Sequence, residues 1–309
     1  MPLCLTEKDV ESLLSPAEVI AAVEACFQRL ARGEIDNRPR TRQKVDGGVF
    51  AVMSAVDHEL RLSGVKSYAW VPSGTPFVVC LFDVERGELA AVIEADKLGQ
   101  LRTGAASAVA AKYLAREGAE SLGVLGCGWQ AESQVQCIRE AVPTIERVVA
   151  YCRTEKNLAK FCKKLDAEPG ETHRDAGAQD IVVTVTTSRD PVLRGEWLQP
   201  GALVCAVGAN DRRARELDNA VLERVSFVCC DSREQSKLES GDLIEPVEQG
   251  LLDWLEVNEL QDVVAGELQG RQSAEDIVLF KSNGIAAWDV AAGALALERA
   301  RERGVGVKV

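Results

Sequence analysis

The first hundred residues combine a helical repeat with several short strand-like runs. Apolar residues recur at helical spacing up to Leu30, so the first 30 residues predict a helix, and Ser15 before Pro16 is typical of a helix start. Short apolar runs separated by turn residues follow at 49–55, 63–71, 77–82 and 89–93. This pattern predicts a small, mostly antiparallel sheet with one flanking helix.

From about Leu101 the pattern changes to an alternation of helices and buried strands. An Ala-rich helical segment ends near Gly118, and a last helix is predicted over 286–304. Between them, apolar, β-branched runs alternate with helical segments; the runs lie at 121–126, 146–152, 180–187, 202–208 and 226–231. Such alternation is typical of a parallel sheet with helices on both faces, which predicts an α/β fold.

Charge and hydropathy exclude several classes of partner. The 309 residues include 48 acidic and 36 basic side chains, giving a formal net charge of −12, which disfavours nucleic acid as a partner. There is no apolar run of roughly 18 residues, so we expect no membrane-spanning helix and no membrane partner. Acidic residues at the N-terminus, such as Glu7 and Asp9, are unlike a signal peptide. We therefore expect a cytoplasmic protein.

Cysteine and histidine limit the possible chemistry. The ten cysteines include no C-x-x-C pair, and four of them lie in apolar runs: Cys80, Cys205, Cys229 and Cys230. Free buried thiols are favoured over disulfides or a zinc site. The two histidines, His58 and His173, are too few for a multi-histidine metal site, and we expect no metal. Proton transfer is then expected from Lys, Asp, Glu or water.

The strongest motif is a glycine-rich turn between a predicted strand and a predicted helix. It matches G-x-G-x-x-A and comprises Gly126, Cys127, Gly128, Trp129, Gln130 and Ala131. Gly126 permits the tight turn, Gly128 allows the backbone to approach a pyrophosphate, and Ala131 allows close helix–strand packing. The motif predicts dinucleotide binding; the alternative is an ordinary tight turn between a strand and a helix.

The end of the second strand of this region indicates which dinucleotide binds. NAD-selective folds place Asp or Glu there to bind the ribose 2′-hydroxyl. Here the strand runs into Arg153 and Thr154, whose side chains are suited to a 2′-phosphate. We expect NADP as the cofactor, with NADPH preferred over NADH, although Arg153 is also explained as an ordinary exposed residue.

Two further strand ends carry candidates for cofactor contact, because ligands bind at the carboxyl ends of strands in such sheets. The candidates are Thr184, Thr186, Thr187 and Ser188 at one strand and Val207, Gly208, Ala209 and Asn210 at the other. The β-propensity of threonine alone is the alternative explanation for the first group.

Three cations upstream of the glycine-rich turn are candidates for holding a substrate. Lys66 interrupts an apolar strand and is expected to point inward, and Arg102 is predicted at the start of the Ala-rich helix, where a cation opposes the helix dipole unless an anion binds nearby. Taken alone, each is better explained as a solvated surface charge. Together with Arg40, and beside a dinucleotide site, they suggest a carboxylate substrate.

The chain resembles the ornithine cyclodeaminase/mu-crystallin family over nearly its whole length. Six segments carry the resemblance in order: PRT at 39–41, GVKS at 64–67, LRTGAAS at 101–107, GCGWQAESQ at 126–134, VGAN at 207–210 and LFKSNGIAAWD at 279–289.

The resemblance implies a homodimer and a domain insertion. A Rossmann-type dinucleotide-binding domain at 116–285 would be inserted into an α+β substrate and dimerisation domain at 1–115, completed by 286–309. It also implies that Arg40 and Arg102 hold the substrate carboxylate, with Lys66 beside the reacting carbon. Four residues would flank the cofactor near its phosphates and nicotinamide: Thr103, Ser282, Asn283 and Gly284.

Asn210 departs from the pattern of the ornithine cyclodeaminases, which resemble this chain here but carry an Asp thought to act in proton transfer. An Asn side chain cannot take up a proton at neutral pH. Asp211 is adjacent, and a shift of one residue in register would allow it to replace the missing acid. The loop that follows also differs from the proline-containing loop of those enzymes.

The favoured hypothesis is an NAD(P)H-dependent oxidoreductase that reduces a C=N bond next to a carboxylate. Its substrate would be a cyclic ketimine, or an imine formed from a 2-oxo acid and an amine; in reverse it would be an amino-acid dehydrogenase such as alanine dehydrogenase. Protonated Lys66 would assist at the carboxylate or nitrogen, and Asn210 would orient the nitrogen. The alternatives are ornithine cyclodeaminase with recycled NAD, and a non-catalytic NADPH-binding protein like mu-crystallin.

Overall fold

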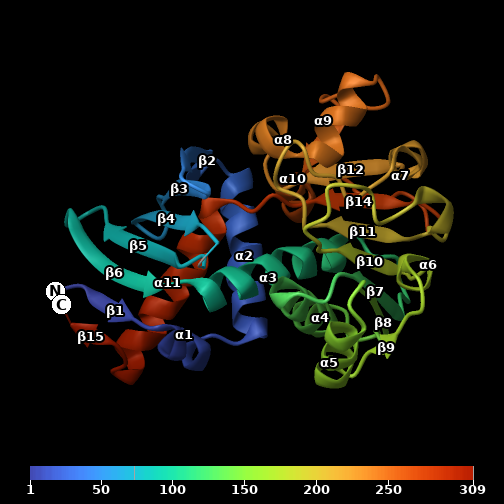
Figure 1. The fold of residues 1–309 in the computed structure, drawn as a ribbon. Helices are drawn as coiled ribbons and strands as arrows, with labels where there is room; N and C mark the ends of the chain where they lie inside the picture. The colour runs from blue at the N-terminus through green and yellow to red at the C-terminus, as the bar shows by residue number, and fades with distance from the viewer. Residues whose placement is uncertain (73, 309) are drawn as a thin grey trace. The chain divides into compact units, whose positions relative to one another are not determined.

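The computed structural model describes residues 1–72 and 74–308, and its contacts divide the chain into two compact units (Figure 1). The first comprises Met1–Arg102 and Gly284–Val309, and the second comprises Thr103–Asn283. Helix α3 (Asp96–Leu114) carries the chain from the first unit into the second. The expected boundary at 115/116 follows the end of this helix, whereas the two units divide within it.

The first unit is built on a seven-stranded sheet in the order β15-β1-β6-β5-β4-β3-β2. Its strands are β1 (Leu3–Leu5), β2 (Ile35–Val45), β3 (Gly48–Asp57), β4 (Leu62–Trp70), β5 (Phe77–Asp83), β6 (Glu88–Glu94) and β15 (Val307–Lys308). Neighbouring strands are antiparallel except for the parallel pair β1 and β6. The C-terminal helix α11 (Ala286–Arg303) packs on β3 and β4. Its close approach requires Gly64, since a Cβ there would lie 2.5 Å from Val290 Cγ2.

The N-terminal segment differs from the single predicted helix. It forms β1, then α1 (Glu7–Leu13), then α2 (Pro16–Ala31). Thr6 and Asp9 form a capping box that starts α1, and the extended backbone of Leu14 ends it. The predicted start of α2 is confirmed, because the Ser15 hydroxyl accepts a hydrogen bond from the Glu18 N–H. The expectation of one flanking helix is therefore wrong: α1, α2 and α11 all belong to this unit.

Helix α3 begins five residues earlier than Leu101, where the Ala-rich pattern starts. The Glu7 carboxylate accepts hydrogen bonds from the N–H groups of Asp96 (2.6 Å) and Lys97 (2.9 Å), so a residue distant in sequence caps the helix. Arg102 consequently lies in the second turn, and the prediction that it sits at the helix start is wrong. The helix-dipole reason for an anion beside Arg102 does not apply, because the dipole effect falls off within the first turn.

The second unit has an eight-stranded parallel sheet in the order β13-β12-β14-β11-β10-β7-β8-β9. The strands are β7 (Ser121–Leu125), β8 (Arg147–Tyr151), β9 (Glu168–Pro169), β10 (Ile181–Thr184), β11 (Leu203–Ala206), β12 (Phe227–Cys230), β13 (Val257–Glu259) and β14 (Val278–Lys281). Connections include α4 (Trp129–Ala141), α5 (Glu155–Leu165), α6 (His173–Gly177), the short helix η1 (Gly195–Trp197), α7 (Asn219–Arg224), α8 (Arg233–Glu239), α9 (Gly241–Glu248) and α10 (Leu260–Val264).

The direction of strand addition reverses beside β7 in this sheet. The chain runs from β7 outward through β8 and β9, then returns to β10 on the other side of β7. This arrangement confirms the predicted Rossmann-type α/β fold, and in such sheets the ligand crevice lies at the carboxyl ends of the strands where the order reverses.

The sulfur chemistry agrees with the sequence prediction. All ten cysteines are free thiols, and Cys205, Cys229 and Cys230 are buried within strands. Cys80 is the exception among the four expected to be buried, because it is only half-buried in β5. Burial raises the pKa of the Cys205 thiol to about 12, because the thiolate is poorly solvated there. Within 1–72 and 74–308, the His, Cys, Asp and Glu side chains form no cluster that could hold a metal ion, and no helix is long and apolar enough to cross a bilayer.

The amino edge of the parallel sheet is held by the Asp180 carboxylate. It accepts five hydrogen bonds: from Arg116 Nε (3.1 Å) and Nη2 (2.6 Å), from the N–H groups of Glu120 (2.9 Å) and Ser121 (3.0 Å), and from Ser121 Oγ (2.9 Å). Burial alone would raise the pKa of Asp180, but the hydrogen bonds from Glu120, Arg116 and Ser121 lower it. Asp180 therefore stabilises the folded state above its ordinary pKa and loses this contribution in acid.

We expect Asp180→Asn to lower the free energy of unfolding by about 1–3 kcal/mol, because part of this donor set loses its acceptor. Denaturant unfolding at neutral pH measures the loss. The exposed Glu267→Gln is the control and should change stability by less than about 0.5 kcal/mol. Equal stability of the two variants would contradict the assignment.

Candidate functional site

Two buried cations of the first unit contact one buried carboxylate, and a third binds the Gly284 carbonyl. Lys66 comes from β4, Arg102 from α3 and Asp289 from the first turn of α11. Lys66 Nζ lies 2.9 Å and Arg102 Nε 3.0 Å from the same oxygen, Asp289 Oδ1. Arg40 of β2 donates from Nη2 to the Gly284 carbonyl at 3.3 Å. The structure thus brings together the three cations that the sequence analysis singled out separately.

Local structure explains why these charges point inward. Lys66 occupies an inward-facing position of β4, opposite the buried Met53 of β3, and its ammonium lies 5.1 Å from the centre of the Phe77 ring. Asp289 lies in the first turn of a helix, where the helix dipole favours an acid. Arg40, Lys66, Arg102 and Asp289 are each less than a tenth exposed.

The cluster carries more positive than negative charge. Burial, and then the neighbouring Arg102, lower the pKa of Lys66 to about 8, while Asp289 opposes the shift. Burial alone would raise the pKa of Asp289, but Arg102 and Lys66 hold it below its usual range. Arg102 Nη1 is buried and has no hydrogen-bond partner among the described residues. An excess of buried cations with an unused guanidinium N–H is suited to an anion such as a carboxylate.

The glycine-rich turn of the second unit connects β7 to α4. Gly126 has a φ of +115°, and a Cβ there would lie 2.5 Å from the Val185 carbonyl oxygen, so glycine is required. Gly128 is the N-cap of α4 without a side-chain cap, and a Cβ at this residue would meet open space. Ala131 is fully buried and Trp129 is half exposed. These features fit a dinucleotide, because backbone N–H groups at a helix start and the helix dipole suit a pyrophosphate.

Arg153 and Thr154 lie where the sequence analysis placed them, directly after β8. Both are exposed, and the Thr154 hydroxyl is not used to cap α5. The positive charge of Arg153 reaches His173 at the start of α6: burial and then Arg153 and Arg194 lower the pKa of His173. This corner of the sheet is therefore electropositive.

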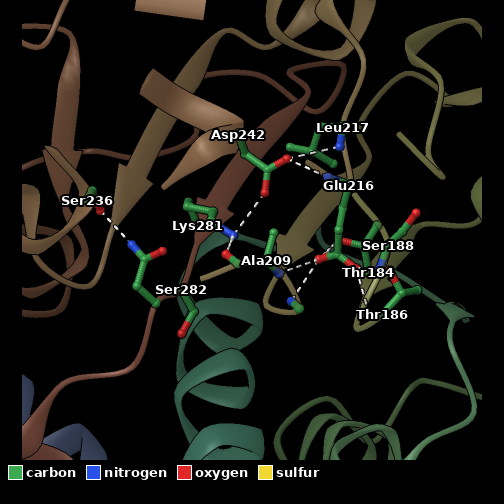
Figure 2. Close-up of polar contacts among 12 residues, drawn as sticks. Thr184, Thr186, Ser188, Ala209, Glu216, Leu217, Ser236, Asp242, Lys281 and Ser282 are labelled. Carbon is green, nitrogen blue, oxygen red and sulfur yellow. Dashed lines mark hydrogen bonds and ion pairs between the residues drawn. The ribbon is translucent and has the colours of Figure 1, made fainter. Parts of the chain in front are cut away.

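The threonines after β10 bind a buried carboxylate that the sequence analysis missed (Figure 2). Thr184 Oγ1 donates to Glu216 Oε2 (3.0 Å) and Thr186 Oγ1 to Glu216 Oε1 (2.7 Å). Thr184 is fully buried. Glu216 also accepts hydrogen bonds from the N–H groups of Gly208 (2.7 Å) and Ala209 (3.1 Å).

The remaining candidates lie at other positions of the two units. In the second unit, Ser282 Oγ (3.1 Å) and the Asn283 N–H (2.7 Å) donate to the buried Asp231, Thr103 is half-buried in α3, and Asn210 is exposed. Val207, which directly follows β11, donates its N–H to the Thr184 carbonyl. In the first unit, Gly284 has a φ of +80° beside Arg102.

The buried charges that sequence reasoning missed include four carboxylates: Glu216, Asp231, Asp242 and Asp289. A signal existed for Asp289, which interrupts an otherwise apolar and small-residue stretch of α11. Asp242 is fully buried but follows a polar segment, and Glu216 lies in a run of charged residues typical of a solvated loop. Periodicity does not separate such residues from surface charges.

Comparison with known proteins extends these observations to the whole chain. The model of the ornithine cyclodeaminase/mu-crystallin family matches residues 2–304. Alanine dehydrogenase of Archaeoglobus fulgidus is 35% identical over 99% of this chain and 98% of its own length.

Two solved structures have the same fold. The Δ1-pyrroline-2-carboxylate reductase of Thermococcus litoralis, in complex with NADH and L-proline, superposes with a TM-score of 0.94 at 35% identity, covering 99% of this chain and all of its own. The iminosuccinate reductase of Paracoccus denitrificans, in complex with NAD⁺, superposes with a TM-score of 0.92 at 29% identity, covering 100% and 99%. The chain belongs to the ornithine cyclodeaminase/mu-crystallin family.

Proposed function

We propose that this protein uses a nicotinamide dinucleotide to reduce a C=N bond next to a carboxylate, or to run that reaction in reverse. The observation that carries the proposal is the buried excess of positive charge around Asp289, in a chain that also has a Rossmann-type unit. The three relatives described above share one chemistry, hydride transfer at a carbon that bears nitrogen beside a carboxylate. The chain is accordingly an NAD(P)-dependent CH–NH oxidoreductase.

Arg102 and Arg40 would hold the substrate carboxylate. Arg102 commits Nε to Asp289, and its buried Nη1 is the donor available for an incoming anion. Asp289 fixes the plane of the guanidinium, so the donor is oriented before the substrate arrives. In a dry site a carboxylate gains charge-assisted hydrogen bonds that also replace its lost hydration.

Lys66 would keep the imine nitrogen protonated or hydrogen-bond the carboxylate. Its pKa of about 8 leaves it largely protonated at neutral pH yet able to give up the proton. A protonated imine accepts a hydride more readily, and the bound cofactor supplies that hydride. Asn210, which follows the end of β11, would orient the nitrogen without titrating.

The glycine-rich turn, the start of α4 and the loops after β10, β11 and β14 would hold the dinucleotide. Arg153 and Thr154 would bind a 2′-phosphate, making NADPH the preferred cofactor.

We further propose that the protein acts as a homodimer in the cytoplasm. Asn210 in place of an acid disfavours ornithine cyclodeaminase, and the intact set of Arg40, Lys66 and Arg102 disfavours a non-catalytic binding protein.

The function is tested by initial rates of NADPH and NADH oxidation by the purified protein. The substrates are cyclic ketimine carboxylates, and pyruvate with ammonia or methylamine. We expect substrate-dependent oxidation, faster with NADPH. A control with L-ornithine and NAD⁺ measures ammonia and proline: their release without imine reduction would assign the cyclodeaminase activity instead. Dinucleotide binding without any turnover would assign a binding protein.

The pH dependence of kcat/KM should reflect the protonation of Lys66. We expect kcat/KM for imine reduction to fall above about pH 8, as Lys66 loses its proton. Asp289→Asn removes the anion that raises the pKa of Lys66, so the alkaline limb should move to lower pH, and kcat/KM should fall roughly 10- to 100-fold with the lost charge-assisted bonds.

The matched control is Asp57→Asn, which breaks another buried ion pair of this unit, with Arg29 at 2.8 Å. This variant should lower the free energy of unfolding but leave the alkaline limb of the kcat/KM profile at the same pH. An alkaline limb that stays at the same pH in Asp289→Asn would refute the role given to Lys66.

Cofactor preference should depend on Arg153. Arg153→Ser is expected to raise the KM for NADPH about tenfold and to leave the KM for NADH nearly unchanged, because a 2′-phosphate loses a charge-assisted hydrogen bond. The control is Lys160→Ala, which removes an exposed cation within α5. It should change neither the KM for NADPH nor the KM for NADH. If Arg153→Ser weakens both cofactors equally, Arg153 does not read the 2′-phosphate.

A further inference from the structure

The structure assigns Glu216 as a positioning residue for dinucleotide binding: its carboxylate joins the loops that follow β10 and β11 at the carboxyl edge of the parallel sheet. The assignment rests on the proposed function only through the dinucleotide. Glu216 is fully buried, and its two oxygens accept five hydrogen bonds (Figure 2).

The five donors come from the last residue of β10 and from the loops that follow β10 and β11. Oε1 accepts from the Thr186 N–H at 2.6 Å and from its hydroxyl at 2.7 Å; Oε2 accepts from Thr184 Oγ1, the Gly208 N–H and the Ala209 N–H. The loops touch directly, since a Cβ on Gly208 would lie 2.4 Å from both the N and O atoms of Thr186. One side chain therefore sets the spacing of two neighbouring strand ends.

The same hydrogen bonds orient the carbonyl groups of these loops. In a trans peptide the carbonyl points opposite to the N–H of the next residue. With the Thr186 N–H held by Glu216, the Val185 carbonyl points away from it, toward Gly126 of the glycine-rich turn. The Val207 carbonyl likewise points away from Glu216, because the Gly208 N–H points toward it. Glu216 thus determines which backbone groups the strand ends can offer a ligand.

A second buried charge holds the other side of the same loop. Lys281 Nζ, at the end of β14, donates to the Ala209 carbonyl at 2.6 Å and lies 2.9 Å from Asp242 Oδ2. Asp242 Oδ1 accepts from the N–H groups of Glu216 (2.7 Å) and Leu217 (3.0 Å), closing the network. The Ala209 residue is fixed through both its N–H and its carbonyl, immediately before Asn210.

Burial and the Asp242 carboxylate raise the pKa of Glu216, while Lys281 and the Thr186 hydrogen bonds lower it. Five donors on two oxygens match an ionised carboxylate and leave no acceptor in this set for a carboxyl proton. An amide at this position would place an NH2 group against N–H donors of one of the loops.

The test compares Glu216→Gln with Asp180→Asn. Asp180 also accepts five hydrogen bonds in the second unit, but at the amino edge of the sheet. Dissociation constants for NADH and NADPH are measured by fluorescence without any imine, alongside unfolding. We expect Glu216→Gln to weaken both cofactors at least about tenfold, corresponding to one lost network, whereas Asp180→Asn lowers stability and leaves both constants unchanged. Among the folded variants, KM for the imine should change less than KM for the cofactor.

If Glu216→Gln does not fold, Thr184→Val tests the same role of Glu216 in cofactor binding. It removes a single donor to Glu216 from a buried strand position and should weaken both cofactors about threefold while keeping the fold. Unchanged dissociation constants in both variants, equal weakening by Asp180→Asn, or a wild-type protein that binds neither dinucleotide would overturn the assignment. A wild-type protein that binds dinucleotide but reduces no imine would overturn the proposed reaction alone.

Discussion

The first unit depends on one oxygen atom, Asp289 Oδ1, which is shared by Lys66 and Arg102. It joins a strand, the second turn of the long helix α3 and the C-terminal helix, three segments far apart in the sequence. Buried ion pairs rarely add net stability, since removing two charges from water costs about as much as their attraction returns. Here the net contribution to stability is less favourable still, because two cations share one anion. Such an arrangement is better suited to binding an anion than to adding stability.

The second unit handles buried charge differently. The carboxylates of Asp180 and Glu216 each accept five hydrogen bonds, at opposite edges of the same sheet. Asp180 accepts hydrogen bonds from an arginine and from the start of β7. Glu216 accepts them from hydroxyl and backbone N–H groups at the carboxyl edge of the sheet. The parallel strands between them are apolar and almost fully buried, so polar organisation is confined to the strand ends. Polar residues at the carboxyl edge can therefore be substituted without changing the apolar strands of the sheet.

The sequence predicted the elements whose pattern is local. Strand and helix alternation from Ser121 onward, the glycine-rich turn and the inward direction of Lys66 could all be derived from spacing and residue type. The split of the N-terminal segment and the early start of α3 could not, because Glu7 caps α3 from almost ninety residues away. The role of Glu216 could not be predicted either, since its threonine partners lie about thirty residues earlier and its neighbours along the chain are charged. The place of the last helix was known only through the family resemblance.

The ten unpaired thiols have a consequence for how this chain reaches its native state. With every sulfur reduced and no disulfide to form, folding involves no oxidative step and no choice among cross-links. The strand cysteines act as small hydrophobes whose high pKa keeps them in the unreactive thiol form. Once folded, the sheet protects them from alkylation and oxidation; in the unfolded chain the same thiols are open to both. The reactivity of these buried strand thiols is therefore a direct readout of unfolding.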